Sequence, residues 1–243
     1  MIVRNESVSP CPVPELTPQV YARWRASELG SLTEALERQL ILEGLGDVSG
    51  KSVLEIGCGD GDFAVTLAKR GAHVTAIDAS EDMIAAARTR ASEQHADVCF
   101  GVAAAQALPF DDERFDIVVA MTILCFVKDA TPVFHEIARV LRPGGYLVIG
   151  ELGKWSWWAL ERRLRAWFGS SLWKRGVFRT PNELSGLARN VGLIPAGVQG
   201  AVYYPRWSWA ARLLAPMDSR IGQFTHYGAA FLALKATKPS KVE

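Results

Sequence analysis

The chain has 243 residues, of which 49% are hydrophobic, enough for one complete core. Its net charge is +1 and no apolar run reaches about 18 residues, so neither a strongly basic nucleic-acid-binding protein nor a membrane-spanning one is expected. Four scattered cysteines without a CxxC spacing, and a polar, Pro-rich start without the apolar core of a signal peptide, predict a cytoplasmic protein without a metal site.

Strands and helices alternate along the first part of the chain. Short apolar runs predict strands at 53–56, 73–78, 98–101, 115–123 and 145–152, and helical patterns predict helices at 62–70, 81–94 and 132–141. Beyond them, a helix with Thr180 as N-cap and Glu183 completing a capping box is expected, then strands at 196–205 and 228–237 around a short helix or loop at 206–214. This order predicts a doubly wound α/β sheet with a ligand site at the carboxyl ends of its strands.

The stretch LEIGCGDGD carries three glycines at alternate positions, between the first predicted strand and the first helix. Glycines there permit a ligand to approach the backbone closely, and the helix start offers unpaired N–H groups. The third glycine of a dinucleotide-binding GxGxxG motif would fall at Asp62, and Glu55 and Asp60 add further negative charge. The turn therefore favours a ligand that carries positive charge over a pyrophosphate.

A further acid, Asp78, ends the second predicted strand. An acid at this place commonly accepts hydrogen bonds from the two ribose hydroxyls of an adenosine group. The alternative is a purely structural acid at the start of the following helix.

Four motifs together resemble the class I S-adenosylmethionine-dependent methyltransferases: VLEIGCGDG, AIDAS, ALPFDDERFDIVVA and LRPGGYLVIGE, over roughly residues 50–152. They are most similar to the branch that includes ubiquinone/menaquinone-type C-methyltransferases. The resemblance implies a seven-stranded sheet with the last strand antiparallel, S-adenosylmethionine as cofactor, and a small, apolar or aromatic methyl acceptor. The cofactor-binding residues that it implies or that lie beside the motifs are Glu55, Gly57, Cys58, Gly59, Asp60, Asp78, Ala79, Met83, Ala105, Gln106 and Met121.

One position departs from the family pattern. Members often read GDAEALPF, with the Asp accepting a hydrogen bond from the adenine amino group, whereas this chain reads AAAQALPF with Ala104 in the Asp position. Gln106 or the backbone N–H of Ala105 could take over this recognition.

Methyl transfer needs a catalytic base only when the acceptor must lose a proton. His226 and Tyr227, just before the last strand, are candidates for that base, and Cys125, after the fourth strand, could face the acceptor. A structural histidine and a small buried apolar cysteine are the alternatives.

The resemblance also implies a single domain with four parts: an N-terminal helical segment (1–48), the S-adenosylmethionine-binding core (49–152), a lid insertion (153–178) and the C-terminal part of the sheet (179–237). In the first part, Tyr21 and Trp24 are expected to cover the pocket and contact the substrate, unless their helix simply docks on the sheet.

The charge and the tryptophans change near residue 150. Residues 1–150 contain 13 Lys and Arg against 21 Asp and Glu, residues 151–243 contain 14 against 5, and seven of the eight tryptophans lie in the second stretch. Within 154–176, an apolar stripe that includes Trp157, Leu164 and Trp167 predicts a helix. Insertions at this place cap the acceptor pocket in the family that the chain resembles, so the resemblance implies a lid over the acceptor, with Trp157 and Trp167 touching it. A membrane-surface helix and a homodimer contact are alternatives. A membrane-associated quinone or lipid methyltransferase and a non-catalytic S-adenosylmethionine-binding protein therefore remain alternative functions.

Overall fold

The computed structural model describes residues 17–167 and 176–241. Seven strands form one sheet in the order β3-β2-β1-β4-β5-β7-β6, in which β7 runs antiparallel to both of its neighbours. The strands are β1 (Ser52–Ile56), β2 (His73–Asp78), β3 (Val98–Val102), β4 (Phe115–Met121), β5 (Leu141–Leu152), β6 (Ile194–Ala201) and β7 (Phe231–Thr237). The predicted seven-stranded sheet with an antiparallel last strand is confirmed, and its strand order reverses between β1 and β4.

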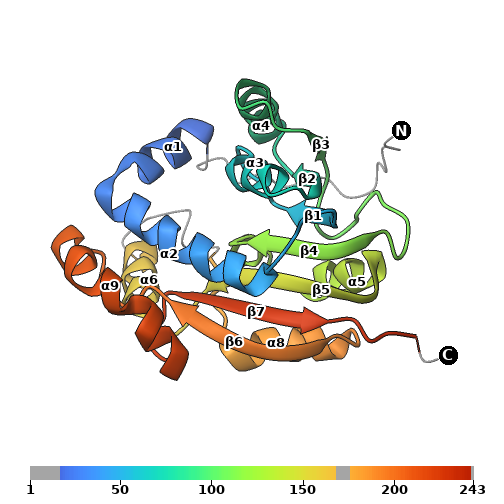
Figure 1. Cartoon of the computed structure of the whole chain (residues 1–243). Helices are drawn as coiled ribbons and strands as arrows, with labels where there is room; N and C mark the ends of the chain where they lie inside the picture. The colour runs from blue at the N-terminus through green and yellow to red at the C-terminus, as the bar shows by residue number, and fades with distance from the viewer. Residues whose placement is uncertain (1–16, 168–175, 242–243) are drawn as a thin grey trace.

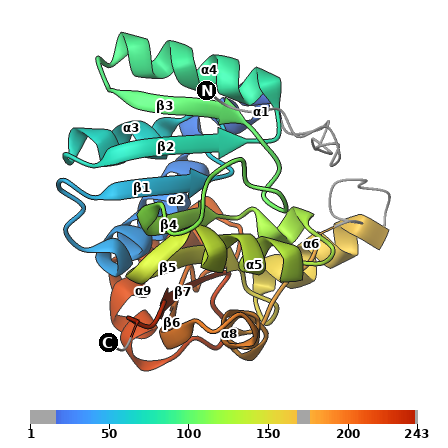
Figure 2. The ribbon, with the colours of Figure 1, turned by 90° about the vertical axis from the view of Figure 1, so that its right-hand side faces the viewer.

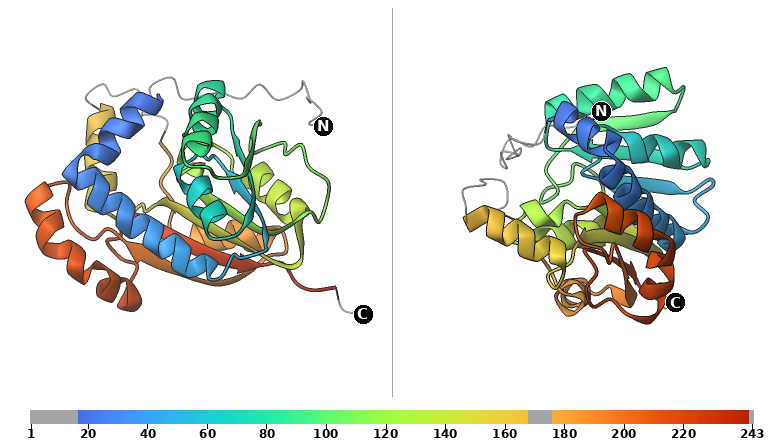
Figure 3. Two further views of the ribbon diagram at one scale, coloured as in Figure 1. Left: turned by 45° about the horizontal axis from the view of Figure 1, so that its top comes forward. Right: turned by 90° about the vertical axis from the view of Figure 1, so that its left-hand side faces the viewer.

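Helices cover both faces of this sheet (Figures 1 and 2). One face carries α2 (Glu28–Leu45), α3 (Asp62–Lys69) and α4 (Glu81–Glu93), while α5 (Thr131–Val140) and α8 (Pro181–Asn190) pack on the other. The N-terminal helix α1 (Pro18–Ala26) precedes α2, and Figure 3 shows α9 (Ser208–Phe224) running beside α2. The remaining described helices are η1 (Leu124–Phe126), a short 3-10 helix, and α6 (Trp157–Trp167).

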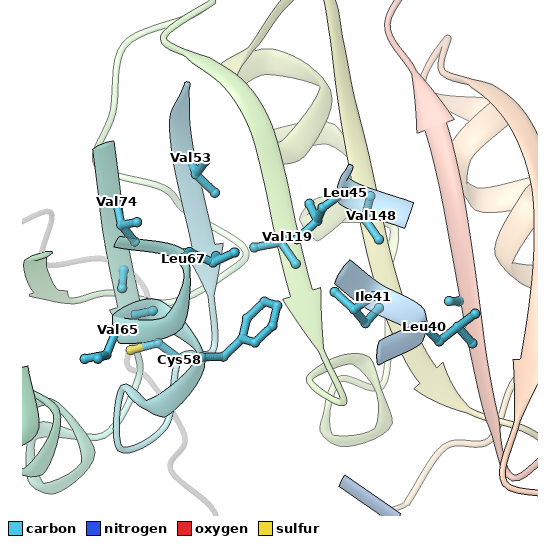
Figure 4. Close-up of a cluster of buried hydrophobic side chains, with 14 of the residues drawn as sticks. Leu40, Ile41, Leu45, Val53, Cys58, Val65, Leu67, Val74, Val119 and Val148 are labelled. Carbon is cyan, nitrogen blue, oxygen red and sulfur yellow. The ribbon is translucent and has the colours of Figure 1, made fainter. Parts of the chain in front are cut away.

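The core forms because successive residues of each buried strand point to opposite faces of the sheet. On β4, Val119 joins the cluster on the α2 and α3 side, whereas its neighbour Val118 joins the cluster under α5 and α8. Figure 4 shows Val53, Val119 and Val148 of three adjacent strands meeting side chains of α2 and α3. Both faces are apolar, so the strands read as continuous hydrophobic runs.

Two helix starts confirm the capping expected from the sequence. The side chain of Ser80 accepts a hydrogen bond from the N–H of Met83 at the start of α4. Thr180 and Glu183 form a complete capping box at the start of α8.

The region around 194–224 differs from the prediction. Strand β6 ends at Ala201 rather than at residue 205, and α9 has 17 residues in place of the short helix or loop expected at 206–214. Val202 adopts a left-handed backbone conformation with φ of 64°, and the buried Asp218 accepts hydrogen bonds from the N–H groups of Val202 and Tyr203 at 2.8 Å. A carboxylate of α9 therefore ends the strand, a long-range contact that local sequence does not encode.

Helix α6 turns a different side inward from the one expected. Trp158 is buried, with 2% of its surface exposed, and its indole N–H donates to the carbonyl of Tyr204 at 2.7 Å. Trp157, Leu164 and Trp167, the predicted inner stripe, are instead exposed at 67%, 47% and 85%. Burying the Trp158 ring, whose N–H has an acceptor, stabilises this rotation of the helix more than burying the predicted apolar stripe would.

No helix within the described ranges 17–167 and 176–241 is long and apolar enough to cross a membrane.

Candidate active site

A cavity of about 350 Å³ opens at the carboxyl ends of β1, β2 and β4. This is the switch point of the sheet, where ligands of doubly wound folds bind. All eleven predicted cofactor residues, from Glu55 to Met121, line this one cavity. Side chains of α1 and α2 form one wall of the cavity, and residues that follow β4 form another.

The glycine turn (residues 57–61) forms the floor of the cavity. Gly57 has φ of 74°, and a Cβ on it would lie 2.0 Å from Cγ2 of Ile123, so this glycine lets the turn pack against the segment after β4. Gly59 has φ of 53°, and a Cβ on it would have nothing within 4 Å. The space beside Gly59 thus belongs to the cavity, where a ligand can pass close to the backbone.

Asp78 links the end of β2 to this turn. Its two carboxylate oxygens accept hydrogen bonds from the N–H groups of Gly59 and Ser80, both at 2.9 Å. Burial raises the pKa of Asp78, and the backbone hydrogen bonds oppose that rise. A carboxylate oxygen has more than one acceptor position, so Asp78 can hold the turn and still accept from ligand hydroxyls.

Glu55 is buried at the end of β1, and its Oε2 has no hydrogen-bond partner among the described residues. Burial raises the pKa of Glu55 to about 8, Arg38 lowers it, and nearby Asp78 and Asp62 raise it further. An unpartnered carboxylate oxygen facing a cavity needs a donor, because an unsatisfied buried polar atom costs free energy. An ammonium group of a ligand would supply that donor.

Asp60, in contrast, already has partners. Its carboxylate pairs with Arg25 of α1 and with Arg90 of α4, the latter at 2.7 Å. Asp60 therefore lines the cavity but ties two helices to the glycine turn, which leaves Glu55 as the unpaired acid beside it.

Two arginines of the N-terminal helices were missed by sequence reasoning. Arg25 and Arg38 both line the cavity, and Arg38 pairs with Asp62 at the start of α3. They bring positive charge to the end of the cavity that holds Glu55, so this end can receive a zwitterion with one carboxylate and one ammonium group. Nothing in the local pattern of α1 or α2 signals this role, because it depends on how the helices cross the sheet.

The η1 loop (residues 122–127) forms an apolar wall of the cavity, to which Ile123, Phe126 and Val127 contribute. Two buried side chains, Glu151 and Arg179, each hydrogen-bond to the backbone of this loop and hold it in place. Glu151, at 0% exposure, accepts from the N–H of Leu124 at 2.6 Å, and Arg179 donates to the carbonyls of Leu124 and Val127 at 2.7 and 3.2 Å.

The three catalytic candidates from the sequence lie outside the cavity. Cys125 is 1% exposed, its thiol donates to the carbonyl of Thr122 at 3.1 Å, and burial raises its pKa well above the usual value. The rings of His226 and Tyr227 stack at 5.3 Å and border a separate cavity of about 130 Å³ near Lys154. None of these three side chains lines the cavity that the glycine turn borders.

Of the four predicted substrate residues, only Tyr21 lines the cavity. Trp24 packs edge-on against Trp158, with ring centroids 6.0 Å apart, and so fastens α1 to α6. Trp157 and Trp167 point away into solvent. Trp173, also part of the predicted lid, lies outside the described residues. Among those described, no group of three or more His, Cys, Asp and Glu side chains is arranged for a metal ion.

The sequence of this chain is similar to those of known methyltransferases. Residues 54–149 match the family model described as a methyltransferase domain. The ubiquinone biosynthesis O-methyltransferase of Alkalilimnicola ehrlichii is 30% identical over 198 residues, which cover 79% of this chain and 79% of that protein. The protein of the same name from Nitrosomonas europaea is 31% identical over 176 residues, covering 70% of this chain and 75% of the relative.

Solved structures share the fold. A possible histamine N-methyltransferase from Thermotoga maritima has a TM-score of 0.67 and 24% identity, covering 90% of this chain and 95% of that one. The magnesium protoporphyrin IX methyltransferase of Synechocystis, solved with bound SAH, also has a TM-score of 0.67, at 17% identity, covering 91% and 95%. Together with the sequence relatives, they show that this chain belongs to the class I S-adenosylmethionine-dependent methyltransferases.

Proposed function

We propose that this methyltransferase transfers a methyl group to a hydroxyl of a small aromatic or quinone-like acceptor. The observation that carries the proposal is a single cavity with a charged end at the glycine turn and an apolar end at the η1 loop. Its volume falls within the range of small-molecule sites. The two sequence relatives are named as O-methyltransferases of ubiquinone biosynthesis, which supports oxygen as the accepting atom and a quinone-like ring.

The residues at the charged end fit S-adenosylmethionine group by group. Asp78 would hold the ribose hydroxyls, and Glu55 Oε2 would accept from the ammonium group. Arg38 would lie near the carboxylate. The open space beside Gly59 would take the chain between them. S-adenosylmethionine, when bound, supplies a methyl group activated by its sulfonium.

The chain's own contribution to the reaction is alignment. An in-line displacement requires the acceptor atom to lie ~3–3.5 Å from the methyl carbon, and water to be kept away. Met121 and the apolar side chains of the η1 loop face the space where an aromatic ring would stack. The buried contacts of Glu151 and Arg179 fix this wall, so its position does not depend on the acceptor.

A panel of ring-matched acceptors tests the proposal. The protein would be incubated with S-adenosylmethionine and, separately, a catechol, a phenol, an aniline and a thiophenol, with S-adenosylhomocysteine and product mass measured. We expect methyl ethers from the hydroxyl acceptors at the highest kcat/KM. Transfer to the amine or thiol alone, or no transfer with any member, would contradict the proposal.

The first site prediction concerns Asp78. Asp78→Ala removes the proposed ribose contact and both backbone hydrogen bonds, so we expect S-adenosylhomocysteine to bind at least tenfold more weakly, about 1.4 kcal/mol. Calorimetry measures this, with Asp97→Ala, an exposed acid before β3, as the control. Unchanged affinity in Asp78→Ala would remove Asp78 from the ligand site.

The second concerns Ala104, which lines the cavity beside Ala105 and Gln106. Ala104→Asp restores an acceptor for the adenine amino group, and a charge-assisted hydrogen bond of about 1.5 kcal/mol would tighten cofactor binding roughly tenfold. Ala104→Asn, which has the same size without the charge, is the matched comparison. Weaker binding by both variants would mean that adenine lies elsewhere along this wall.

A further inference from the structure

Glu37 places a carboxylate in the wall of the cavity. It lies on α2 and lines the cavity together with Tyr21 of α1. Its neighbours on the same helix, Glu34 and Arg38, are joined by an ion pair at 3.6 Å. Within the part of the chain that the structure describes, Glu37 itself has no hydrogen bond and no ion pair.

The charges around Glu37 separate it from the cofactor end. The pKa of Glu37 is shifted by the charges of Arg162 on α6 and Glu34 on its own helix. The charge of Glu37 in turn raises the pKa of Tyr21 on α1 and of Tyr204 after β6. The pKa of Glu55, by comparison, is shifted by the charges of Arg38, Asp78 and Asp62.

Glu37 therefore faces the cavity beside Tyr21, and the charges that shift its pKa differ from those that shift the pKa of Glu55. Tyr204 is not a competing base, because its hydroxyl is hydrogen-bonded to that of Thr33 at 3.1 Å and burial raises its pKa to about 12. Tyr21 is excluded as a base for the same physical reason, since burial raises its pKa further still.

We propose that Glu37 is the general base that accepts the proton of the acceptor hydroxyl. The inference rests on the proposed function, since only an acceptor that loses a proton requires a base. In the step, the acceptor oxygen forms a bond to the methyl carbon, the pair of the broken carbon–sulfur bond remains on sulfur, and the hydroxyl proton passes to a carboxylate oxygen of Glu37. The proton then leaves to solvent when the products depart.

The electrostatics of Glu37 suit this task. Burial raises its pKa to about 8, Arg162 opposes the rise and Glu34 adds to it. A base closer in pKa to a phenol is a stronger proton acceptor than an ordinary carboxylate. Because only the ionised form accepts a proton, kcat/KM should increase with pH up to about 8 and then level off.

The test compares Glu37→Gln with wild type on two acceptors. One is an ordinary phenol or catechol, protonated at the assay pH, and the other is a nitro-substituted relative that is already ionised. With the first, we expect kcat/KM to fall by a factor of about 10² or more, the usual contribution of a general base, and the rise toward pH 8 to disappear. With the second, we expect a change of less than about threefold.

The control is Glu43→Gln, an exposed glutamate nearly two turns further along α2, which should behave as wild type with both acceptors. Equal losses on the two acceptors, or a retained pH profile, would overturn the role of Glu37 while the proposed function stands. Weaker binding of S-adenosylhomocysteine to Glu37→Gln would also overturn it, because it would assign Glu37 to the cofactor. Failure of the wild-type protein to methylate either acceptor would overturn both proposals.

Discussion

Gly59→Val is expected to reduce the affinity for S-adenosylhomocysteine by more than about a hundredfold, a loss of about 2.7 kcal/mol. The added side chain would project from the turn into the open part of the cavity, where no protein atom lies within 4 Å. It would occupy the space through which the methionine portion of the ligand passes. Calorimetric titration measures the loss.

The positive φ of Gly59 makes a control necessary, because any side chain there also strains the backbone. Gly50→Val is the matched variant, in the loop before β1 and away from the cavity: Gly50 has φ of 69°, and a Cβ on it would have nothing within 4 Å. Both variants should lose similar stability in urea, and only Gly59→Val should lose the ligand. Retained affinity in Gly59→Val would make the turn a structural feature alone.

The second large effect concerns folding. Trp158→Ala is expected to lower the free energy of unfolding by about 3–5 kcal/mol, because it removes a buried indole and leaves a cavity. The indole N–H donates to Tyr204, Trp24 packs on its edge, and the guanidinium groups of Arg162 and Arg206 lie 5.2 and 5.0 Å from the centroid of its ring. This one side chain thus joins α1, α6 and the segment before α9.

Its neighbour provides the control. Trp157→Ala, next in the chain and 67% exposed, should change the unfolding free energy by no more than about 0.5 kcal/mol. Urea denaturation of the two variants decides which face of α6 is buried. A large loss of unfolding free energy in Trp157→Ala and a small one in Trp158→Ala would mean that α6 has the rotation predicted from the sequence.

The position of the glycine turn and of Asp78 was predictable because its determinants are local. The glycines must follow β1 immediately, and Asp78 must end β2, so parallel neighbours bring them to the same sheet edge whatever the rest of the chain does. The same holds for the capping box at Thr180 and for the strands of the core, whose apolar runs were matched to within a few residues.

The parts of the cavity wall that come from α1, α2 and the η1 loop were not predictable, because they are assembled from distant segments. Arg25 and Glu37 reach the cavity only through the way α1 and α2 cross the sheet. The placing of the η1 loop depends on Arg179, more than 50 positions later in the chain. The wrong prediction of the buried side of α6 has the same origin. Periodicity predicts an apolar stripe, but the contact of Trp158 with the distant Trp24 determines which side of the helix is buried.

A crystal structure with bound S-adenosylhomocysteine tests the central claim most directly. We predict that the ribose hydroxyls lie within hydrogen-bond distance of the Asp78 carboxylate and that the amino group contacts Glu55. The sulfur should point toward the space between Glu37 and Phe126. A ligand bound outside the cavity, or one whose sulfur faces away from Glu37, would contradict the claim that methyl transfer takes place there.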